Sequence, residues 1–76
     1  MNGANRYSIV IEWSDEDQTY VVLLPEWKER VYQPVTDGPT YEEAARKGRA
    51  VLETLIEQAR QYGEQLPAPR IFAATA

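Results

Sequence analysis

The fold is decided by residues 38–63, which read GPTYEEAARKGRAVLETLIEQARQYG. Thr40 is a favourable N-cap residue, and Glu43, three positions later, completes the capping-box pattern of a helix start. Gly63 is placed to supply the left-handed residue that ends a helix. We therefore predict one long helix that runs from Tyr41 to about Tyr62.

Apolar and small residues recur along this helix at spacings of three and four, so they form one stripe. The predicted stripe contains Ala44, Ala45, Gly48, Val51, Leu52, Leu55, Ile56, Ala59 and Tyr62. Charged residues occupy most of the opposite side. A helix with this pattern packs its stripe against another layer and leaves the charged side in water.

The segments before the helix predict three strands. Residues 7–13 alternate apolar and polar side chains, which is typical of a strand with one apolar face. Residues 14–18 are polar and turn-forming. Residues 19–24 are apolar on both faces, which favours a central strand, and Pro25 ends it. A third, shorter strand is predicted over Val31–Val35.

The remaining segments complete a β-β-β-α-β order. Residues 37–39 are predicted to form a turn, residues 66–69 an extended connector, and Arg70–Ala74 a last short strand. The fold class is therefore α+β, with two layers: an antiparallel sheet covered on one face by a single long helix. Residues 1–6 are predicted to be a disordered leader, and residues 7–76 a single domain.

The length of the chain allows only one small core. It has 76 residues, of which 43% are hydrophobic, and two domains would each fall below roughly 40 residues, where folding unaided usually fails. One helix covers one sheet face, so the other face, with Val10, Val21 and Leu23, is expected to stay partly apolar. Size and patterning together predict a homo-dimer, a tetramer or an obligate partner.

The composition excludes several classes of function. The chain has no Cys and no His, so the commonest metal ligands, the usual general base and the best nucleophile are missing. We expect no enzyme, no metal and no cofactor. Twelve acids against eight bases give a net charge of -4, which disfavours direct nucleic-acid binding and favours a basic protein partner.

The sequence also predicts a location. A membrane span needs about 20 consecutive apolar residues, and no such run occurs. The start of the chain lacks the apolar core of a signal peptide. A cytoplasmic protein without membrane association is the expectation.

Trp27 is the first candidate for a partner-binding residue. It lies in a charged loop with Lys28 and Arg30, and no alternation of apolar residues predicts its burial. Exposed tryptophans beside basic residues are common anchors at protein interfaces. We therefore predict a contact loop at Trp27, Lys28 and Arg30, with simple packing of the ring inside the loop as the alternative.

A second candidate site is the acidic patch Asp15, Glu16 and Asp17, which is expected to face basic groups of a partner. The segment lacks the ligand spacing and the glycine of a calcium loop, so a solvated turn is favoured over a metal site. The adjacent carboxylates of Glu42 and Glu43 are explained by helix capping and the helix dipole rather than by acid–base chemistry.

Aromatic residues surround the predicted sheet: Tyr7, Trp13, Tyr20, Trp27, Tyr32 and Tyr41. RNA-binding sheets stack bases on such rings but also surround them with positive charge, which this half of the chain lacks. Core packing is therefore the interpretation for Tyr7, Trp13 and Tyr20.

The run Val22 to Pro69 resembles the HicB-like antitoxin family of bacterial toxin–antitoxin pairs. The resemblance rests on Leu24-Pro25-Glu26-Trp27, on Gly38-Pro39-Thr40-Tyr41-Glu42-Glu43-Ala44, on a long helix that ends at Tyr62-Gly63, and on Leu66-Pro67-Ala68-Pro69. It implies a degenerate ribonuclease-H-like fold without the metal-binding carboxylates. It also implies a non-catalytic antitoxin that binds and neutralises a small basic HicA-type toxin, a ribonuclease that cleaves mRNA.

Two other classes of function compete with this one. The first is an orphan structural or regulatory homo-oligomer that has no toxin partner and binds through its second sheet face. The second is a metal-dependent nuclease on the same fold, which would need several converging carboxylates. Asp15 and Asp17 lie in a predicted turn, which disfavours the nuclease. The motif that carries the family resemblance is structural and brings no functional residues with it.

Overall fold

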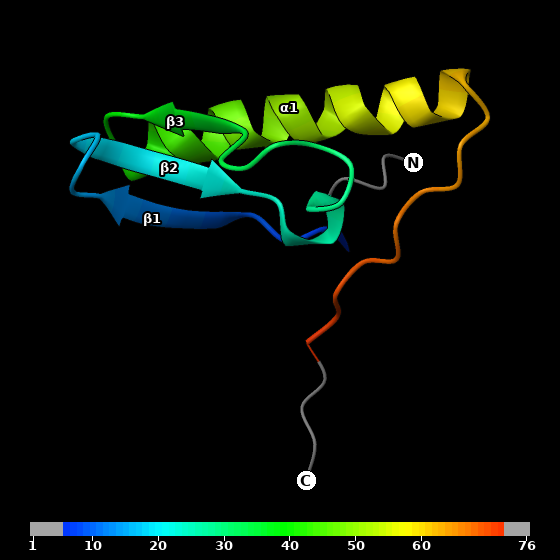
Figure 1. The fold of residues 1–76 in the computed structure, drawn as a ribbon, viewed down its shortest axis with the longest axis horizontal. Coiled ribbons are helices and arrows are strands. Elements are labelled where there is room, and N and C mark those ends of the chain that lie inside the picture. The colour runs from blue at the N-terminus through cyan, green and yellow to red at the C-terminus, as the bar shows by residue number, and fades with distance from the viewer. Residues whose placement is uncertain (1–5, 73–76) are drawn as a thin grey trace, which may run out of the picture.

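The computed structural model describes residues 6–72, which form a three-stranded antiparallel sheet and one long helix (Figure 1). The strands are β1 (Val10–Ser14), β2 (Thr19–Leu23) and β3 (Thr36–Gly38), and the helix is α1 (Tyr41–Gln61). The sheet order is β1-β2-β3, and α1 packs on one face of it. The α+β class and the β-β-β-α order confirm the prediction.

The hairpin of β1 and β2 follows from its polar turn. The Oγ of Ser14 accepts a hydrogen bond from the Asp17 N–H at 3.1 Å, and the Ser14 carbonyl accepts one from the Gln18 N–H at 2.8 Å. Gln18 has a φ of 56°, the left-handed conformation that closes the turn. The turn fixes the register, so Trp13 pairs with Tyr20 across the two strands.

The third strand lies later in the chain than predicted. We expected it over Val31–Val35, but β3 is Thr36–Gly38, part of which was expected to be a turn. The side-chain amide of Gln33 explains the shift. It accepts a hydrogen bond from the Leu24 N–H at 2.9 Å and donates one to the Leu24 carbonyl at 3.0 Å. These are the backbone groups that a neighbouring strand would pair with.

The start of α1 is the predicted one. The Oγ1 of Thr40 accepts a hydrogen bond from the Glu43 N–H at 3.1 Å, which confirms Thr40 as the N-cap. The other half of the capping box does not form, because the Glu43 carboxylate binds the guanidinium of Arg46 at 2.7 Å. The Thr40 side chain therefore caps one of the free N–H groups in the first turn of the helix. The Glu43 side chain forms an ion pair on the helix surface instead.

The end of α1 also follows from the sequence. The last helical residue is Gln61, and Gly63 has the left-handed φ of 67° that was predicted for it. The Gly63 N–H donates to the Arg60 carbonyl at 3.2 Å, and the Glu64 N–H donates to the Ala59 carbonyl at 2.8 Å. This pair of hydrogen bonds is a Schellman motif, which satisfies the last carbonyls of the helix.

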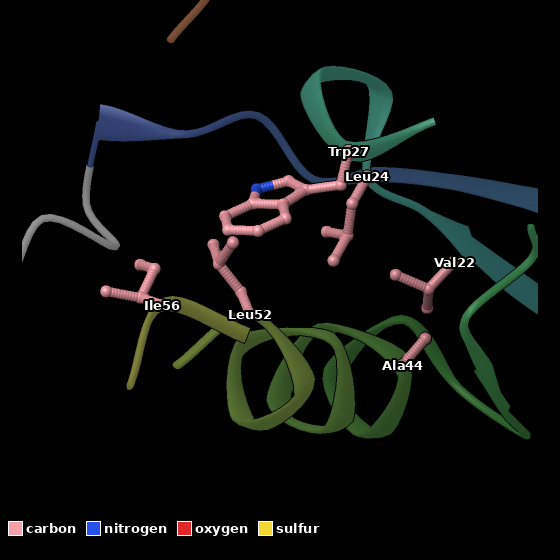
Figure 2. Packing of buried hydrophobic residues seen from close by; sticks show 6 residues of the cluster. All are labelled: Val22, Leu24, Trp27, Ala44, Leu52 and Ile56. Atoms are coloured by element: carbon pink, nitrogen blue, oxygen red, sulfur yellow. The ribbon is translucent and has the colours of Figure 1, made fainter. Parts of the chain in front are cut away.

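The core lies between α1 and the sheet (Figure 2). Its buried cluster consists of Val22, Leu24, Trp27, Ala44, Leu52 and Ile56. A Cβ atom added to Gly48 would lie 2.7 Å from Cγ1 of Val22, so the helix backbone approaches β2 closely at this glycine. The buried stripe is narrower than predicted, because Ala45 and Tyr62 are exposed.

Glu26 ties the two ends of the described chain to the domain. Its carboxylate accepts hydrogen bonds from the Ser8 N–H at 3.1 Å and from the Arg70 N–H at 2.8 Å. Ser8 is therefore engaged outside the sheet, and β1 begins at Val10 rather than at Tyr7, where we predicted it. The hydroxyl group of Tyr7 reinforces the tie by donating to the Pro67 carbonyl at 2.6 Å.

The predicted last strand, Arg70–Ala74, is wrong for residues 70–72, which belong to no strand. The backbone N–H of Arg70 donates to the Glu26 carboxylate, so at this residue a side chain takes the donor that a strand ladder would use. Residues 73 and 74 of that prediction lie outside the described residues. The predicted leader, residues 1–6, also lies outside them except for Arg6, and so do residues 75 and 76 of the predicted domain.

The uncovered face of the sheet has the residues predicted for it. Val10 pairs with Leu23, and both of these residues and Val21 alternate with the buried positions of the hairpin, so they lie on the side away from α1. All three are half-buried. Glu12 and Asp37 flank Val21 in the register of the sheet, so this face combines apolar residues with carboxylates.

We predict that Gly48→Ala destabilises the protein although alanine favours helix. The propensity gain is about 1 kcal/mol. The added methyl group would lie 2.7 Å from Cγ1 of Val22, and overpacking of this kind costs about 1–3 kcal/mol. The free energy of unfolding, measured by chemical denaturation, is expected to fall. Ala50→Gly, at an exposed position of α1, is the control that measures propensity alone. A Gly48→Ala variant more stable than the wild type would contradict the close contact.

We also predict a loss of stability in acid that depends on Glu26. Burial of its carboxyl group raises the pKa, but hydrogen bonds from the backbone of Arg70, of Glu26 itself and of Ser8 outweigh burial, and the pKa is lowered from 4.5. A lowered pKa stabilises the folded state above the ordinary glutamate pKa, and the contribution is lost as the pH falls through the lowered value.

Glu26→Gln is therefore expected to reduce stability at neutral pH and to weaken its decline in acid, measured by urea denaturation at a series of pH values. Glu43→Gln is the matched control. The hydrogen bond from Arg46 lowers the pKa of Glu43 too, but this residue lies on the helix surface, far from the chain ends. If Glu26→Gln kept the full acid dependence, the role of Glu26 as a tie would be wrong.

Candidate protein-binding surfaces

The two predicted contact sites lie at opposite ends of the sheet (Figure 1). The acidic turn, residues 15–18, connects β1 to β2, and the charged loop, residues 28–32, follows the other end of β2. The strand β2 separates them along its whole length. The structure therefore has two distinct candidate surfaces, one at each end of β2.

The prediction that Trp27 is an exposed contact residue is wrong. A single 3-10 turn, Pro25–Trp27, directs the indole ring inward, where it is 1% exposed and packs beside Leu24 and Leu52 (Figure 2). The backbone N–H of Trp27 donates to the Leu24 carbonyl at 3.0 Å, which closes this turn. The ring of Tyr7 lies 5.6 Å away, so a residue twenty positions earlier helps to cover the tryptophan.

The other charged residues of the loop lie at the surface, and one of them, Arg30, forms a hydrogen bond. Arg30 donates from Nη2 to the Gln65 carbonyl at 2.6 Å, and its guanidinium lies 5.5 Å from the Trp27 ring centroid. Arg30 therefore fastens the segment after α1 to the core. Lys28 and Tyr32 are exposed, and residues 28–32 line an open hollow of about 350 Å³. Acidic Glu29 lies between the two bases, so this surface has no single sign of charge.

The acidic turn is exposed and fixed in shape. Asp15, Glu16 and Asp17 are all exposed, and in the part of the chain that the structure describes none of them takes part in an ion pair. Gln18 donates from its side chain to the Asp15 carbonyl at 2.7 Å, and the Ser14 hydroxyl donates to the Asp17 carboxylate at 3.2 Å. These local hydrogen bonds hold the turn while its negative charge faces water.

The three carboxylates of the acidic turn are not grouped as the ligands of one metal ion would be. Residues 6–72 contain no group of three or more acidic side chains placed to hold an ion. These carboxylates are exposed, and among residues 6–72 none of them forms an ion pair.

A row of three aromatic rings lies beside the acidic turn, and the sequence did not predict it. Trp13 meets Tyr20 edge to face, with ring centroids 5.1 Å apart, and Tyr20 lies 4.4 Å from Tyr41. Trp13 is 49% exposed and Tyr41 60% exposed, whereas we expected Trp13 in the core. The indole Nε1 of Trp13 donates to the Asp15 carboxylate at 3.3 Å, which joins the row to the turn.

The position of α1 explains why Trp13 is exposed while Tyr20 is half-buried. Trp13 and Tyr20 extend from the same sheet face as the buried Val22. The helix begins only at Tyr41 and packs mainly on β3 and β2, so the end of β1 lies beyond its cover. The turn fixes the pairing of Trp13 with Tyr20, so this pair could have been predicted from the sequence. Where α1 begins relative to the pair is set by tertiary packing and could not.

We call the acidic turn and the ring row together the hairpin-end surface. It consists of Trp13, Asp15, Glu16, Asp17, Tyr20 and Tyr41. The chain from residue 7 to residue 27 contains five acids and no base, so the sequence around this surface has one sign of charge. Aromatic faces and carboxylates both attract cations.

No protein-family model matches the chain, and no curated protein and no solved structure matches it either. Its function is therefore argued from its own residues. Within residues 6–72 the structure has no helix with the length and apolar character that crossing a membrane requires.

We predict that Trp27→Ala severely destabilises the domain, because loss of a buried tryptophan costs about 3–5 kcal/mol. Trp27→Phe is expected to cost less, since it keeps a ring and removes an indole N–H that is buried without a hydrogen-bond partner among the described residues. Chemical denaturation and near-ultraviolet circular dichroism measure both effects.

Tyr32→Ala is the matched control for the loss of an aromatic ring, because Tyr32 is 97% exposed in the same loop. Its effect on the free energy of unfolding is expected to stay within about 0.5 kcal/mol. A Trp27→Ala variant as stable as the wild type would contradict the burial of Trp27 and restore the contact-loop hypothesis.

Proposed function

We propose that this protein is a non-catalytic, protein-binding domain: a HicB-like antitoxin that binds and neutralises a small basic ribonuclease toxin of the HicA type. The observation that carries the proposal is the hairpin-end surface, which presents exposed carboxylates without ion pairs in residues 6–72 beside exposed aromatic rings. Aromatic anchors with charges of one sign around them are typical of interfaces with an oppositely charged partner.

The net charge of -4 supports a basic partner. Opposite charges speed the association of two proteins and disfavour wrong partners, and the effect weakens as salt rises. Neutralisation then needs no chemistry by this chain, because an inhibitor that covers the active site of a ribonuclease keeps RNA away from it. The antiparallel sheet and single helix are compatible with the α+β domain in which the residues of the family resemblance lie.

A second candidate is supported by the face of the sheet away from α1. Half-buried Val10 on that face lines an open hollow of about 300 Å³ together with Ile71 and Phe72, both of which are exposed. An orphan homo-oligomer, structural or regulatory and without a toxin, would cover this area with a second copy of the chain. Light scattering of the purified protein separates the two candidates, since a stable dimer or tetramer that captures no toxin favours the orphan.

The proposal predicts a neighbouring gene that encodes a short basic ribonuclease, and the direct test is co-expression of the protein with that ribonuclease. The antitoxin is expected to restore growth and to co-purify with the ribonuclease as a complex. A toxin that stays active and does not bind the protein would overturn the proposal.

We further predict that Glu16→Lys combined with Asp17→Lys slows the association of the complex by about tenfold or more at low salt, because the steering charge is reversed. Stopped-flow or surface-based kinetics at two salt concentrations measure the rate. Glu57→Lys combined with Glu64→Lys is the matched control, since it makes the same change of charge at exposed positions outside the hairpin-end surface. Equal effects of the two pairs would show that net charge, rather than this surface, steers the partner.

A further inference from the structure

The ring row is a partly exposed continuation of the layer that forms the core. Trp13 and Tyr20 stand on the sheet face that packs against α1, and Tyr41 is the first residue of that helix. Deeper along the same face, Val22 and Leu24 are fully buried beneath the helix. The two outer rings of the row, Trp13 and Tyr41, are therefore left exposed on either side of the half-buried Tyr20, and a partner segment can lie against them.

The rings and the nearest carboxylate are already held in place. The ring centroids of Trp13 and Tyr20 lie 5.1 Å apart, and the Trp13 indole Nε1 donates to the Asp15 carboxylate at 3.3 Å. The side-chain amide of Gln18 donates a hydrogen bond to the Asp15 carbonyl at 2.7 Å. Tyr20 contacts Tyr41 at 4.4 Å with a tilt of 35° between the ring planes. Because these contacts exist in the free protein, binding would order few side chains, which lowers its entropic cost.

The charges around the row select the kind of group that binds. Asp15, Glu16 and Asp17 border the row at Trp13, and Glu42 follows Tyr41 at the other end of it. A nucleic-acid strand also stacks on aromatic rings, but its phosphates would meet these carboxylates. A neutral ring or an aliphatic side chain would use the stacking and leave the charges without a role. A cation uses both.

Among cationic side chains, arginine fits the row better than lysine. Its guanidinium group is planar, weakly hydrated and able to stack on an aromatic face while it donates to a carboxylate in its own plane. We infer that the hairpin-end surface is the docking site for an arginine-bearing basic segment of the partner protein, with a guanidinium on the row of Trp13, Tyr20 and Tyr41 and its donors directed to the acidic turn. This inference rests on the proposed function for the existence of a basic partner, and adds the surface and the side chain.

The test uses the wild-type protein and three synthetic peptides with capped ends. Each peptide has eight residues, in which glycine alternates with arginine, with lysine or with citrulline, the uncharged counterpart of arginine. Nuclear magnetic resonance follows the two indole N–H signals, of which Trp13 reports on the hairpin-end surface and Trp27 on the core. The arginine peptide is expected to shift the Trp13 signal and not the Trp27 signal.

The three peptides are expected to bind in the order arginine, lysine, citrulline, with arginine about threefold or more tighter than lysine. Trp13→Leu and Tyr41→Leu are each expected to weaken binding of the arginine peptide by about two- to fivefold in calorimetry. Tyr32→Leu is the matched control, because it removes an exposed ring from the other end of the sheet and is expected to leave binding unchanged.

Several results would overturn the inference. Equal binding of the arginine and lysine peptides would remove the assignment to arginine. Loss of binding on Asp15→Asn with no effect of the ring variants would show that charge alone attracts the peptide. Shifts confined to the loop of Lys28 and Tyr32 would place the site at the other end of the sheet. The peptide mapping needs no variant, so it decides the inference even if Trp13→Leu folds poorly.

Failure of the inference and failure of the proposed function give different results. If the arginine peptide binds the row but no ribonuclease toxin binds or is neutralised, the surface stands and the antitoxin function fails. If the toxin is neutralised and Trp13→Leu and Tyr41→Leu bind it with unchanged affinity, the antitoxin function stands and the docking site lies elsewhere.

Discussion

The close approach of α1 to β2 at Gly48 is the contact on which the rest of the structure depends. With no side chain at this position, the helix backbone lies directly against Val22. The larger residues Leu52 and Ile56 then reach the space beside β2, where Leu24 and Trp27 complete the cluster (Figure 2). A domain this short has little apolar surface to bury, so its stability depends on how closely these two layers pack.

The same packing decides what stays uncovered. A single helix that packs mainly on β2 and β3 leaves the end of β1 less covered, and Trp13 and Tyr41 stay exposed beside the half-buried Tyr20. The hairpin turn then places Asp15 against the first of these rings. The surface on which we base the proposed function therefore depends on where the single helix lies on the sheet.

Local patterns predicted the elements well because their causes are local. Thr40 caps the helix through an N–H three residues away, and Gly63 ends it through its own φ angle. The turn at residues 15–18 closes through its own side chains. The third strand was misplaced because its position depends on Gln33, whose amide takes the backbone groups of Leu24 across a loop. No periodicity in the sequence reports a hydrogen bond of that kind.

By itself the sequence determined the helix and its two ends, the polar turn that joins the first two strands, and an acidic stretch without a base between residues 7 and 27. Only the tertiary structure decided which tryptophan is covered, and the outcome reversed the prediction. Trp27, in a charged loop, is buried, and Trp13, in an alternating strand, is half exposed. The physical reason is that burial depends on where the second layer begins and ends, which neither residue's neighbours in the chain encode.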